Sequence, residues 1–285
     1  MRNLQFSMSA LAAAVCFLGS CNSVDASKPL DTYSVQSIKK SGNNIECKYT
    51  IEYPKGDDSL SIKVAQYISS NMGKAYLPLQ NLEDESDAKK YPLYSGATAD
   101  GNALADYYAN GTMAFLKDQV KELADAGMQD IPGMSYEMTM SKTEDNPHYL
   151  TYETTTSAFL GGAHGTSASY AVNIVKATGH VLTQTVDTLQ LKAMQPLLRE
   201  GVLSYLHEAG DTEVSDKTLN DQLFVENGVI PMPAYTPCLT KDGVRFVYQQ
   251  YEIGPYAMGM PTFTVPYAKI RQYLTKEANE LVAGD

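Results

Sequence analysis

The chain has 285 residues and is 44% hydrophobic, so it is long enough to bury a substantial core. Its formal net charge of −11 excludes nucleic acid as the expected partner, because the phosphate backbone binds basic surfaces, and it favours a cationic protein or peptide instead. Acidic charge also serves solubility alone, and the acidic run within residues 83–87 is expected to be a solvated loop.

The N-terminus has the layout of a signal peptide. Arg2 gives a short positive region, and the uncharged, mostly apolar run from Leu4 to Phe17 is too short to form a spanning helix, which needs about 20 apolar residues. The sequence Leu18-Gly19-Ser20-Cys21 then resembles a lipobox. This resemblance implies that residues 1–20 are removed and that Cys21 receives lipid. An ordinary secreted protein with an incidental cysteine is the alternative.

Residues 21–32 are small and polar and end near Pro29, which predicts a lipidated tether with order beginning near Tyr33. No second apolar stretch of spanning length follows. Lipid on Cys21 is therefore the expected membrane attachment. The predicted location is the cell envelope, and both a periplasmic and a cell-surface orientation are open.

Residues 33–156 are predicted to form an N-terminal α+β part. Apolar residues alternate from Ile45 to Tyr53 after the turn Gly42-Asn43-Asn44, which predicts a hairpin. Helical spacing of apolar residues predicts two amphipathic helices, one from Leu60 to Met72 and one from Leu104 to Leu123. Beyond these helices the apolar residues again alternate with polar ones, which predicts a second hairpin that turns at residues 145–147.

Residues 157–285 are predicted to form a second α+β part, which either stands alone or packs with the first. Thr178-Gly179 and Lys241-Asp242-Gly243 are hairpin turns, with a helix from Leu189 to His207 between them. A short strand and a terminal helix from Tyr267 end the chain. Tight turns favour antiparallel pairing, so the predicted fold class is α+β, with antiparallel sheets and helices packed on one face.

Two cysteines, Cys47 and Cys238, follow the predicted lipidation site. A disulfide between them could persist in the envelope. Both lie in strand-like apolar contexts, where cysteine is often a small buried hydrophobe, and this second interpretation is favoured. The chain has no CxxC pair and no histidines at ligand spacing, so neither a metal site nor a cofactor is predicted.

A glycine-rich segment, Gly161-Gly162-Ala163-His164-Gly165, is the first candidate for a functional loop. Its spacing differs from that of dinucleotide and phosphate loops, so nucleotide binding is not predicted. His164 could act as a base, a ligand or a pH sensor. The commoner role of a lone histidine in such a loop is structural, with a hydrogen bond to a neighbouring carbonyl.

The second candidate loop is Tyr251 to Gly259, where Glu252 lies between tyrosines and desolvation could raise its pKa. A glycosidase needs a pair of carboxylates across a cleft, and the sequence places only one. The residue types of a hydrolase triad are present in Ser157, His164 and Asp187, but Ser157 is not in a G-x-S-x-G elbow motif. No catalytic residue is therefore assigned. The candidate ligand-binding residues of the two loops are Gly161, Gly162, His164, Gly165, Tyr251, Glu252, Pro255 and Tyr256.

The C-terminal motifs resemble a known domain. They are the glycine loop at 161–165, Leu239-Thr240-Lys241-Asp242-Gly243, the loop Tyr251 to Gly259, and Phe263-Thr264-Val265-Pro266-Tyr267, in this order between Ser157 and Leu274. They look like the extracytoplasmic domain of unknown function shared by RsiV-type lysozyme-sensing anti-sigma factors and some peptidoglycan deacetylases. The resemblance implies an α+β module that binds at the cell surface, in one branch to lysozyme, and that is not itself an enzyme.

These observations give one leading hypothesis and two alternatives. The leading hypothesis is a lipid-anchored, non-catalytic envelope module that binds a lysozyme-like protein or a peptidoglycan fragment. The 20 tyrosines would suit protein or glycan binding if exposed, although packing within strands is the commoner role. The alternatives are a cell-wall hydrolase or deacetylase that uses His164 and Glu252, and a structural envelope protein.

Overall fold

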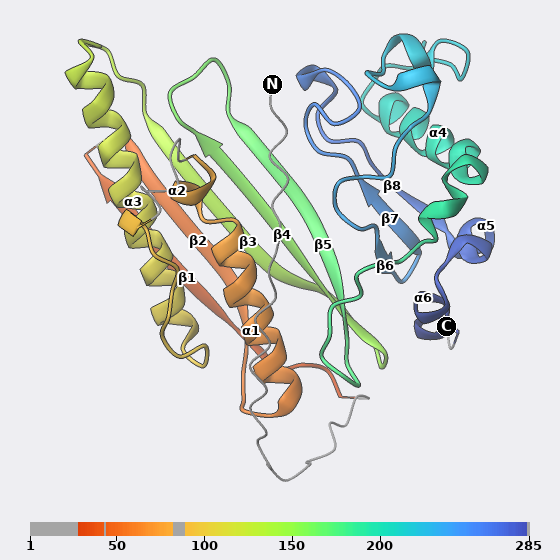
Figure 1. The fold of residues 1–285 in the computed structure, drawn as a ribbon, viewed down its shortest axis with the longest axis horizontal. Helices are drawn as coiled ribbons and strands as arrows, with labels where there is room; N and C mark the ends of the chain where they lie inside the picture. Colours follow the sequence, from red (N-terminus) through yellow and green to blue (C-terminus); the bar gives the residue numbers. More distant parts are fainter. Residues whose placement is uncertain (1–27, 43, 82–88, 284–285) are drawn as a thin grey trace.

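The computed structural model describes residues 28–42, 44–81 and 89–283. The predicted signal peptide, Cys21 and most of the predicted tether lie outside the described residues. Within them, the chain forms a five-stranded sheet and a separate three-stranded sheet, each with helices packed against it (Figure 1). The predicted α+β class is therefore confirmed. No helix in the described part of the chain is both long and apolar enough to cross a membrane.

The five-stranded sheet is mixed, whereas the sequence analysis predicted antiparallel sheets. Its strand order is β1-β2-β3-β4-β5, and β2 pairs with β3 in parallel while the other neighbours are antiparallel. The long helical connection between β2 and β3 explains this, because a crossover of that length can return the chain in the same direction. The strands are β1 (Thr32–Ser41), β2 (Ile45–Pro54), β3 (Met134–Asp145), β4 (Tyr149–Phe159) and β5 (Thr166–Val175).

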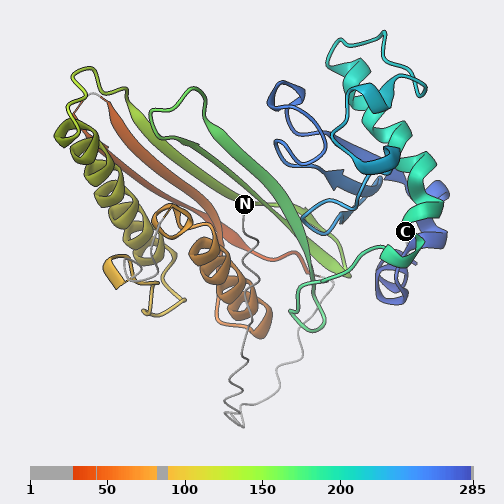
Figure 2. The ribbon, with the colours of Figure 1, turned by 45° about the horizontal axis from the view of Figure 1, so that its top comes forward.

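The crossover helices α1 (Ser59–Lys74) and α3 (Gly101–Asp125) cover one face of this sheet, as Figure 2 shows, with the short α2 (Leu77–Gln80) between them in the chain. The helices begin one and three residues before their predicted starts at Leu60 and Leu104, and each has an aspartate cap. Asp58 accepts hydrogen bonds from two backbone N–H groups of α1, and Asp100 accepts one from α3. The inward side chains form the first core, in which most of the tyrosines are packing residues.

The second sheet is antiparallel in the order β6-β7-β8 and packs against α4. The predicted terminal helix is interrupted, because Leu274 is extended and forms an isolated bridge with Val186. The elements are β6 (Cys238–Thr240), β7 (Gly243–Val247), β8 (Thr262–Pro266), α4 (Leu191–Glu208), α5 (Tyr267–Ile270) and α6 (Lys276–Leu281). The 3-10 turns are η2 (Thr188–Gln190), η3 (Leu219–Asp221), η4 (Glu226–Gly228), η5 (Tyr256–Met258) and η6 (Arg271–Tyr273).

The two sheets have separate hydrophobic cores that meet at one end of β4 and β5. Tyr149 and Val175 are cross-strand partners in the first sheet, yet both pack in the second core. The predicted boundary between residues 156 and 157 falls inside β4, and the chain passes to the second core only after β5. The two parts therefore share a packed interface.

A single buried amide joins the sheets across this interface. Asn173 of β5 is 2% exposed. Its Oδ1 accepts a hydrogen bond from Leu239 N at 2.7 Å, and its Nδ2 donates to Leu239 O at 2.9 Å. Arg245 of β7 also forms an ion pair with Glu153 of β4 at 3.0 Å. The carboxamide of Asn173 thus gives β6 the hydrogen bonds that a neighbouring strand would give it.

Cys47 and Cys238 are both buried free thiols, so the disulfide considered above is not formed. The two residues lie in different sheets, where each thiol has its own neighbours. Cys47 donates a hydrogen bond to Ala109 O at 3.2 Å, and Cys238 interacts with Arg245. Burial raises the pKa of Cys47 to about 11, which keeps this thiol protonated and unreactive at neutral pH.

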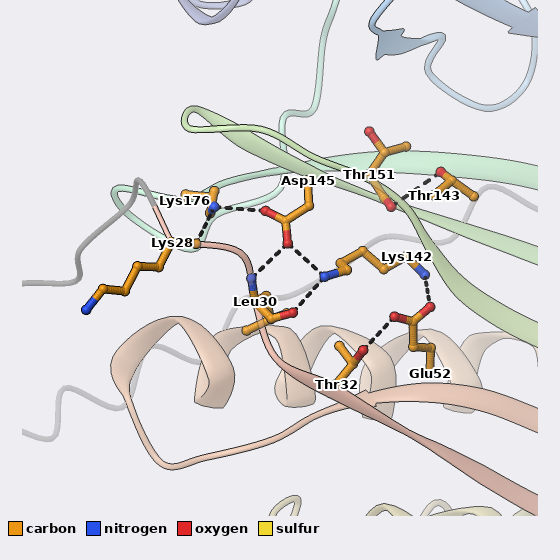
Figure 3. A network of polar contacts seen from close by, with 9 residues as sticks. All are labelled: Lys28, Leu30, Thr32, Glu52, Lys142, Thr143, Asp145, Thr151 and Lys176. Atoms are coloured by element: carbon orange, nitrogen blue, oxygen red, sulfur yellow. Dashed lines mark hydrogen bonds and ion pairs between the residues drawn. The ribbon is translucent and has the colours of Figure 1, made fainter.

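The last residues of the predicted tether pack against the first sheet, contrary to the prediction that order begins near Tyr33. Leu30 is buried, with 6% of its surface exposed. Its backbone N–H donates to Asp145 Oδ2 at 2.8 Å, and its carbonyl accepts from Lys142 Nζ at 2.6 Å. Lys176 Nζ donates to the carbonyl of Lys28 at 2.7 Å. Two lysines therefore hold the entering chain by its backbone (Figure 3).

Asp145 is the centre of this network. Its Oδ2 is 2.7 Å from Lys142 Nζ, and its Oδ1 is 2.8 Å from Lys176 Nζ. The side chain of Lys176 is 1% exposed and that of Asp145 is 11% exposed. One carboxylate thus pairs with two ammonium groups at the end of β3, in surroundings that largely exclude water.

Candidate functional site

The structure brings the two loops singled out from the sequence together. The first, residues 160–165, joins β4 to β5, and the second follows β7. Two glutamines at the start of the second loop bond the outer edge of β5. Gln250 Oε1 accepts from Ser167 N at 3.0 Å, and Gln249 Oε1 accepts from Ser169 N at 3.1 Å while its Nε2 donates to Ser169 O at 2.8 Å. These hydrogen bonds cover part of the outer edge of β5, which has no neighbouring strand there, and they fix the second loop beside the first.

His164, Tyr251 and Tyr256 form a compact aromatic group, which we call the His–Tyr cluster. The rings of His164 and Tyr256 are stacked, with centroids 4.0 Å apart and planes 25° apart. The ring of Tyr251 lies 5.7 Å from that of Tyr256, and its hydroxyl is 3.2 Å from His164 Nε2. Both His164 and Tyr251 are exposed, so the cluster forms part of the surface.

The hydrogen bonds of His164 indicate which ring nitrogen carries the proton. Nδ1 is 3.0 Å from the carbonyl oxygen of Gly165, which can only accept, so Nδ1 carries a hydrogen. In the neutral ring Nε2 is then an acceptor, and the Tyr251 hydroxyl donates to it. The same Gly165 carbonyl accepts from the Tyr256 hydroxyl at 3.1 Å. The ring thus makes the carbonyl contact expected of a structural histidine, and it also orients an exposed tyrosine.

Tyr251 has an unusual backbone conformation, with φ of 64° and 56% of its surface exposed. A bulky residue in the left-handed region is strained, typically by about 1–2 kcal/mol. Asn227, at φ 53°, is the only other non-glycine residue with positive φ in the part of the chain that the structure describes, and asparagine tolerates this conformation well. The strain at Tyr251 holds a large ring on the surface.

Glu252 is tied to the backbone of its own part of the fold. Its Oε1 accepts from Ala234 N, and its Oε2 accepts from Gln249 N, both at 2.6 Å. Desolvation raises the pKa of Glu252, as the sequence analysis expected, and the two backbone hydrogen bonds oppose that rise. Because each oxygen accepts from a backbone N–H group, the carboxylate positions two loop segments.

The remaining predicted residues shape the loops. Gly161 has φ of 82°, in the region that favours glycine, and a Cβ there would lie 3.0 Å from Pro132. Gly162 is exposed, with open space around it. Pro255 is the N-cap of η5, which carries Tyr256. These residues form the backbone that presents the His–Tyr cluster, and Gly165 contributes its carbonyl to it.

Part of the His–Tyr cluster lies in a segment of the chain that matches a family model. Residues 190–268 match the model of DUF3298, a family described as a protein of unknown function. This DUF3298 region contains α4, the second sheet and the Tyr251 loop. The His164 loop lies before it, so the cluster is made partly from outside the matched region.

Two solved structures are similar to the chain over most of its length. A member of the DUF3298 family from Bacteroides fragilis has a TM-score of 0.61 at 18% identity, covering 89% of this chain and 98% of that one. A DUF3298 family protein from Pseudomonas aeruginosa has a TM-score of 0.54 at 15% identity, with the same coverages of 89% and 98%. No curated protein matches the chain. At these identities the similarity shows a shared fold.

Sequence reasoning missed the residues that assemble the site. Gln249 and Gln250, inside the DUF3298 region, fix the Tyr251 loop to β5. These contacts join residues far apart in the chain, and no periodic pattern in the sequence predicts them. The stack of Tyr170 on Tyr235, with centroids 4.1 Å apart, was missed for the same reason. Across residues 28–42, 44–81 and 89–283, no group of three or more His, Cys, Asp or Glu side chains is placed to hold a metal ion.

Proposed function

We propose that this protein is a lipid-anchored envelope module that binds a macromolecular ligand, a lysozyme-like cationic protein or a cell-wall fragment, through the His–Tyr cluster. The observation that carries the proposal is Tyr251, an exposed ring held at φ 64° and hydrogen-bonded to His164. Backbone strain at an exposed side chain is characteristic of functional sites. Tyrosine also offers a rigid contact surface at low entropic cost.

Two further observations support the class of ligand. The net charge of −11 would attract a cationic protein by electrostatic steering. The motif resemblance to the domain of lysozyme-sensing anti-sigma factors points to the same partner. The hydrolase or deacetylase alternative has less support, because both oxygens of Glu252 are bonded to backbone N–H groups. A purely structural envelope protein would bind neither ligand.

Replacing Tyr251 with glycine separates the strain from the binding. We expect Tyr251→Gly to raise the free energy of unfolding by up to about 1 kcal/mol, because glycine relieves the left-handed strain at some entropic cost. We also expect it to weaken lysozyme or muropeptide binding by about tenfold or more, the loss of about 1.4 kcal/mol that marks a central aromatic contact. Urea denaturation and isothermal titration at low salt measure the two effects.

Asn227→Gly is the matched control, because it also places glycine at a positive φ, 53°, but removes no ring. It should change neither stability nor affinity appreciably. Binding to lysozyme should weaken as salt is added, since the attraction is screened. The cluster is not the binding surface if Tyr251→Gly binds as well as the wild type. The ligand assignment is wrong if the wild type binds neither lysozyme nor muropeptides at low salt.

The lipid anchor is tested at Cys21. Cells that express the protein are supplied with a labelled fatty acid. They should transfer the label to the wild type and not to the Cys21→Ser variant, because only the thiol at the end of the lipobox accepts a diacylglyceryl group. Cys16→Ser is the matched control, since Cys16 lies inside the predicted signal peptide, and it should be labelled normally. Labelled Cys21→Ser protein would exclude this anchor.

A further inference from the structure

The outer edge of β5 is covered by different partners at its two ends. After the turn at Thr178-Gly179 the chain comes back along β5, where Leu182 N donates to Asn173 O at 2.8 Å. It then leaves the strand, and Thr185 Oγ1 bonds Pro237 O at 2.5 Å. At the other end, the carboxamide of Gln249 bonds both backbone groups of Ser169. Ala171 lies between these two covered positions.

The backbone groups of Ala171 face this gap. In an antiparallel pair, alternate residues direct their N–H and C=O groups away from the neighbouring strand. Ser169 and Asn173 use such outward groups to bond Gln249 and Leu182, so those of Ala171, midway between them, point the same way. Ala171 is only 5% exposed, and its outward groups have no protein partner among the described residues. Buried backbone groups are rarely left unpaired.

A cavity of about 260 Å³ opens at this point. Its walls are residues 170–173 of β5, residues 181–183 and residues 234–237, and none of these residues is charged. The ring of Tyr235 forms part of the wall and stacks on Tyr170 with planes 10° apart. The cavity therefore offers the backbone donor and acceptor of Ala171 beside an aromatic surface and uncharged walls.

The far wall is held in place by hydrogen bonds. Glu252 Oε1 accepts from Ala234 N at 2.6 Å, and Thr236 Oγ1 donates to Thr183 O at 3.0 Å. The cavity is thus largely formed without a ligand, which lowers the entropic cost of binding.

We infer that this cavity binds the primary carboxamide of a neutral ligand, with the carboxamide oxygen accepting from Ala171 N–H and its NH₂ donating to Ala171 O. The fold contains this arrangement twice, because Gln249 bonds Ser169 and Asn173 bonds Leu239 in the same way. A carboxylate can only accept and would bring an unpaired charge into an uncharged cavity. An added β-strand does not fit, since the positions on both sides of Ala171 are occupied.

Two matched pairs of probes test the carboxamide and distinguish its source. N-acetyl-glutamine methylamide and its glutamate counterpart represent a peptide side chain, and nicotinamide and nicotinate represent a free small molecule. In NMR titrations of the full mature chain, one or both carboxamides should shift the Ala171 amide resonance saturably. The matching acids should bind about tenfold more weakly or worse, since they leave the Ala171 carbonyl unpaired. Whichever carboxamide binds more tightly identifies the source.

Two variants test whether the carboxamide probe binds in this cavity or at the His–Tyr cluster. Tyr235→Ala, which removes the aromatic wall, should weaken carboxamide binding about fivefold or more, and Tyr251→Ala should leave it unchanged. The inference is overturned if neither carboxamide shifts Ala171, which is the result expected for a cavity that holds water only. Equal affinity for amide and acid, or full affinity in Tyr235→Ala, would overturn it as well. Lysozyme binding is a separate measurement, so the two proposals fail independently.

Discussion

Asp145→Ala should lower the free energy of unfolding by about 3–5 kcal/mol, the usual cost of leaving a buried charge without its partner. The variant would leave Lys142 and Lys176 without their shared carboxylate partner, and the side chain of Lys176 is 1% exposed. It would also remove the acceptor of the Leu30 N–H. Urea denaturation followed by circular dichroism at neutral pH measures the loss.

Asp125→Ala is the control for this variant. Asp125 pairs with Lys121 at 2.7 Å, but both side chains are more than half exposed, and such surface pairs contribute about 0.2–1 kcal/mol. We expect Asp125→Ala to be nearly neutral. If the two aspartate variants lost similar stability, the Asp145 network would be no more important to the fold than a surface ion pair.

Asn173→Ala should lower the free energy of unfolding by about 2–4 kcal/mol, because it leaves the buried N–H of Leu239 unpaired and its C=O with only a long hydrogen bond from the Thr151 hydroxyl. The lost hydrogen bonds are ones that join the two sheets. We therefore also expect the two parts to unfold less cooperatively. Tyrosine fluorescence and far-ultraviolet circular dichroism, which coincide for a two-state transition, should separate in this variant.

Asn102→Ala provides the comparison, since Asn102 is exposed on α3 and alanine is a better helix former. It should be neutral or slightly stabilising and should keep coincident transitions. Unchanged stability in Asn173→Ala would mean that the interface does not depend on this amide.

Local patterns predicted most of the elements of the fold. The period of two from Ile45 to Tyr53 gave β2, and helical spacing gave α1 and α3 with nearly correct bounds. Tight turns also located the β3–β4 and β6–β7 hairpins. Each of these predictions depends on neighbours in the chain. The parallel pairing of β2 with β3 joins residues about 90 positions apart in the chain, as in Ile45 with Met134, and no local pattern encodes it.

The candidate site was predictable in its residues and not in its assembly. Glycines and a histidine marked the first loop, and tyrosines around the single charged residue Glu252 marked the second. Their meeting depends on Gln249 and Gln250, whose side chains replace a strand partner on β5. The hydrogen-bond partners of Glu252 could not be predicted for a related reason. Its pKa is raised by burial, but its oxygens are already used by backbone N–H groups that sequence cannot place.

The point where the N-terminal segment is held has a consequence for how an anchored molecule would stand on a membrane. Leu30 is fixed beside Asp145, next to the start of β4, while the His164 loop follows the other end of that strand. β4 has 11 residues, so at about 3.3 Å per residue the two points are separated by about 35 Å. With lipid on Cys21, the His–Tyr cluster would lie at the end of β4 that is farther from the anchored N-terminal segment. A large partner could then reach the cluster without touching the lipid headgroups.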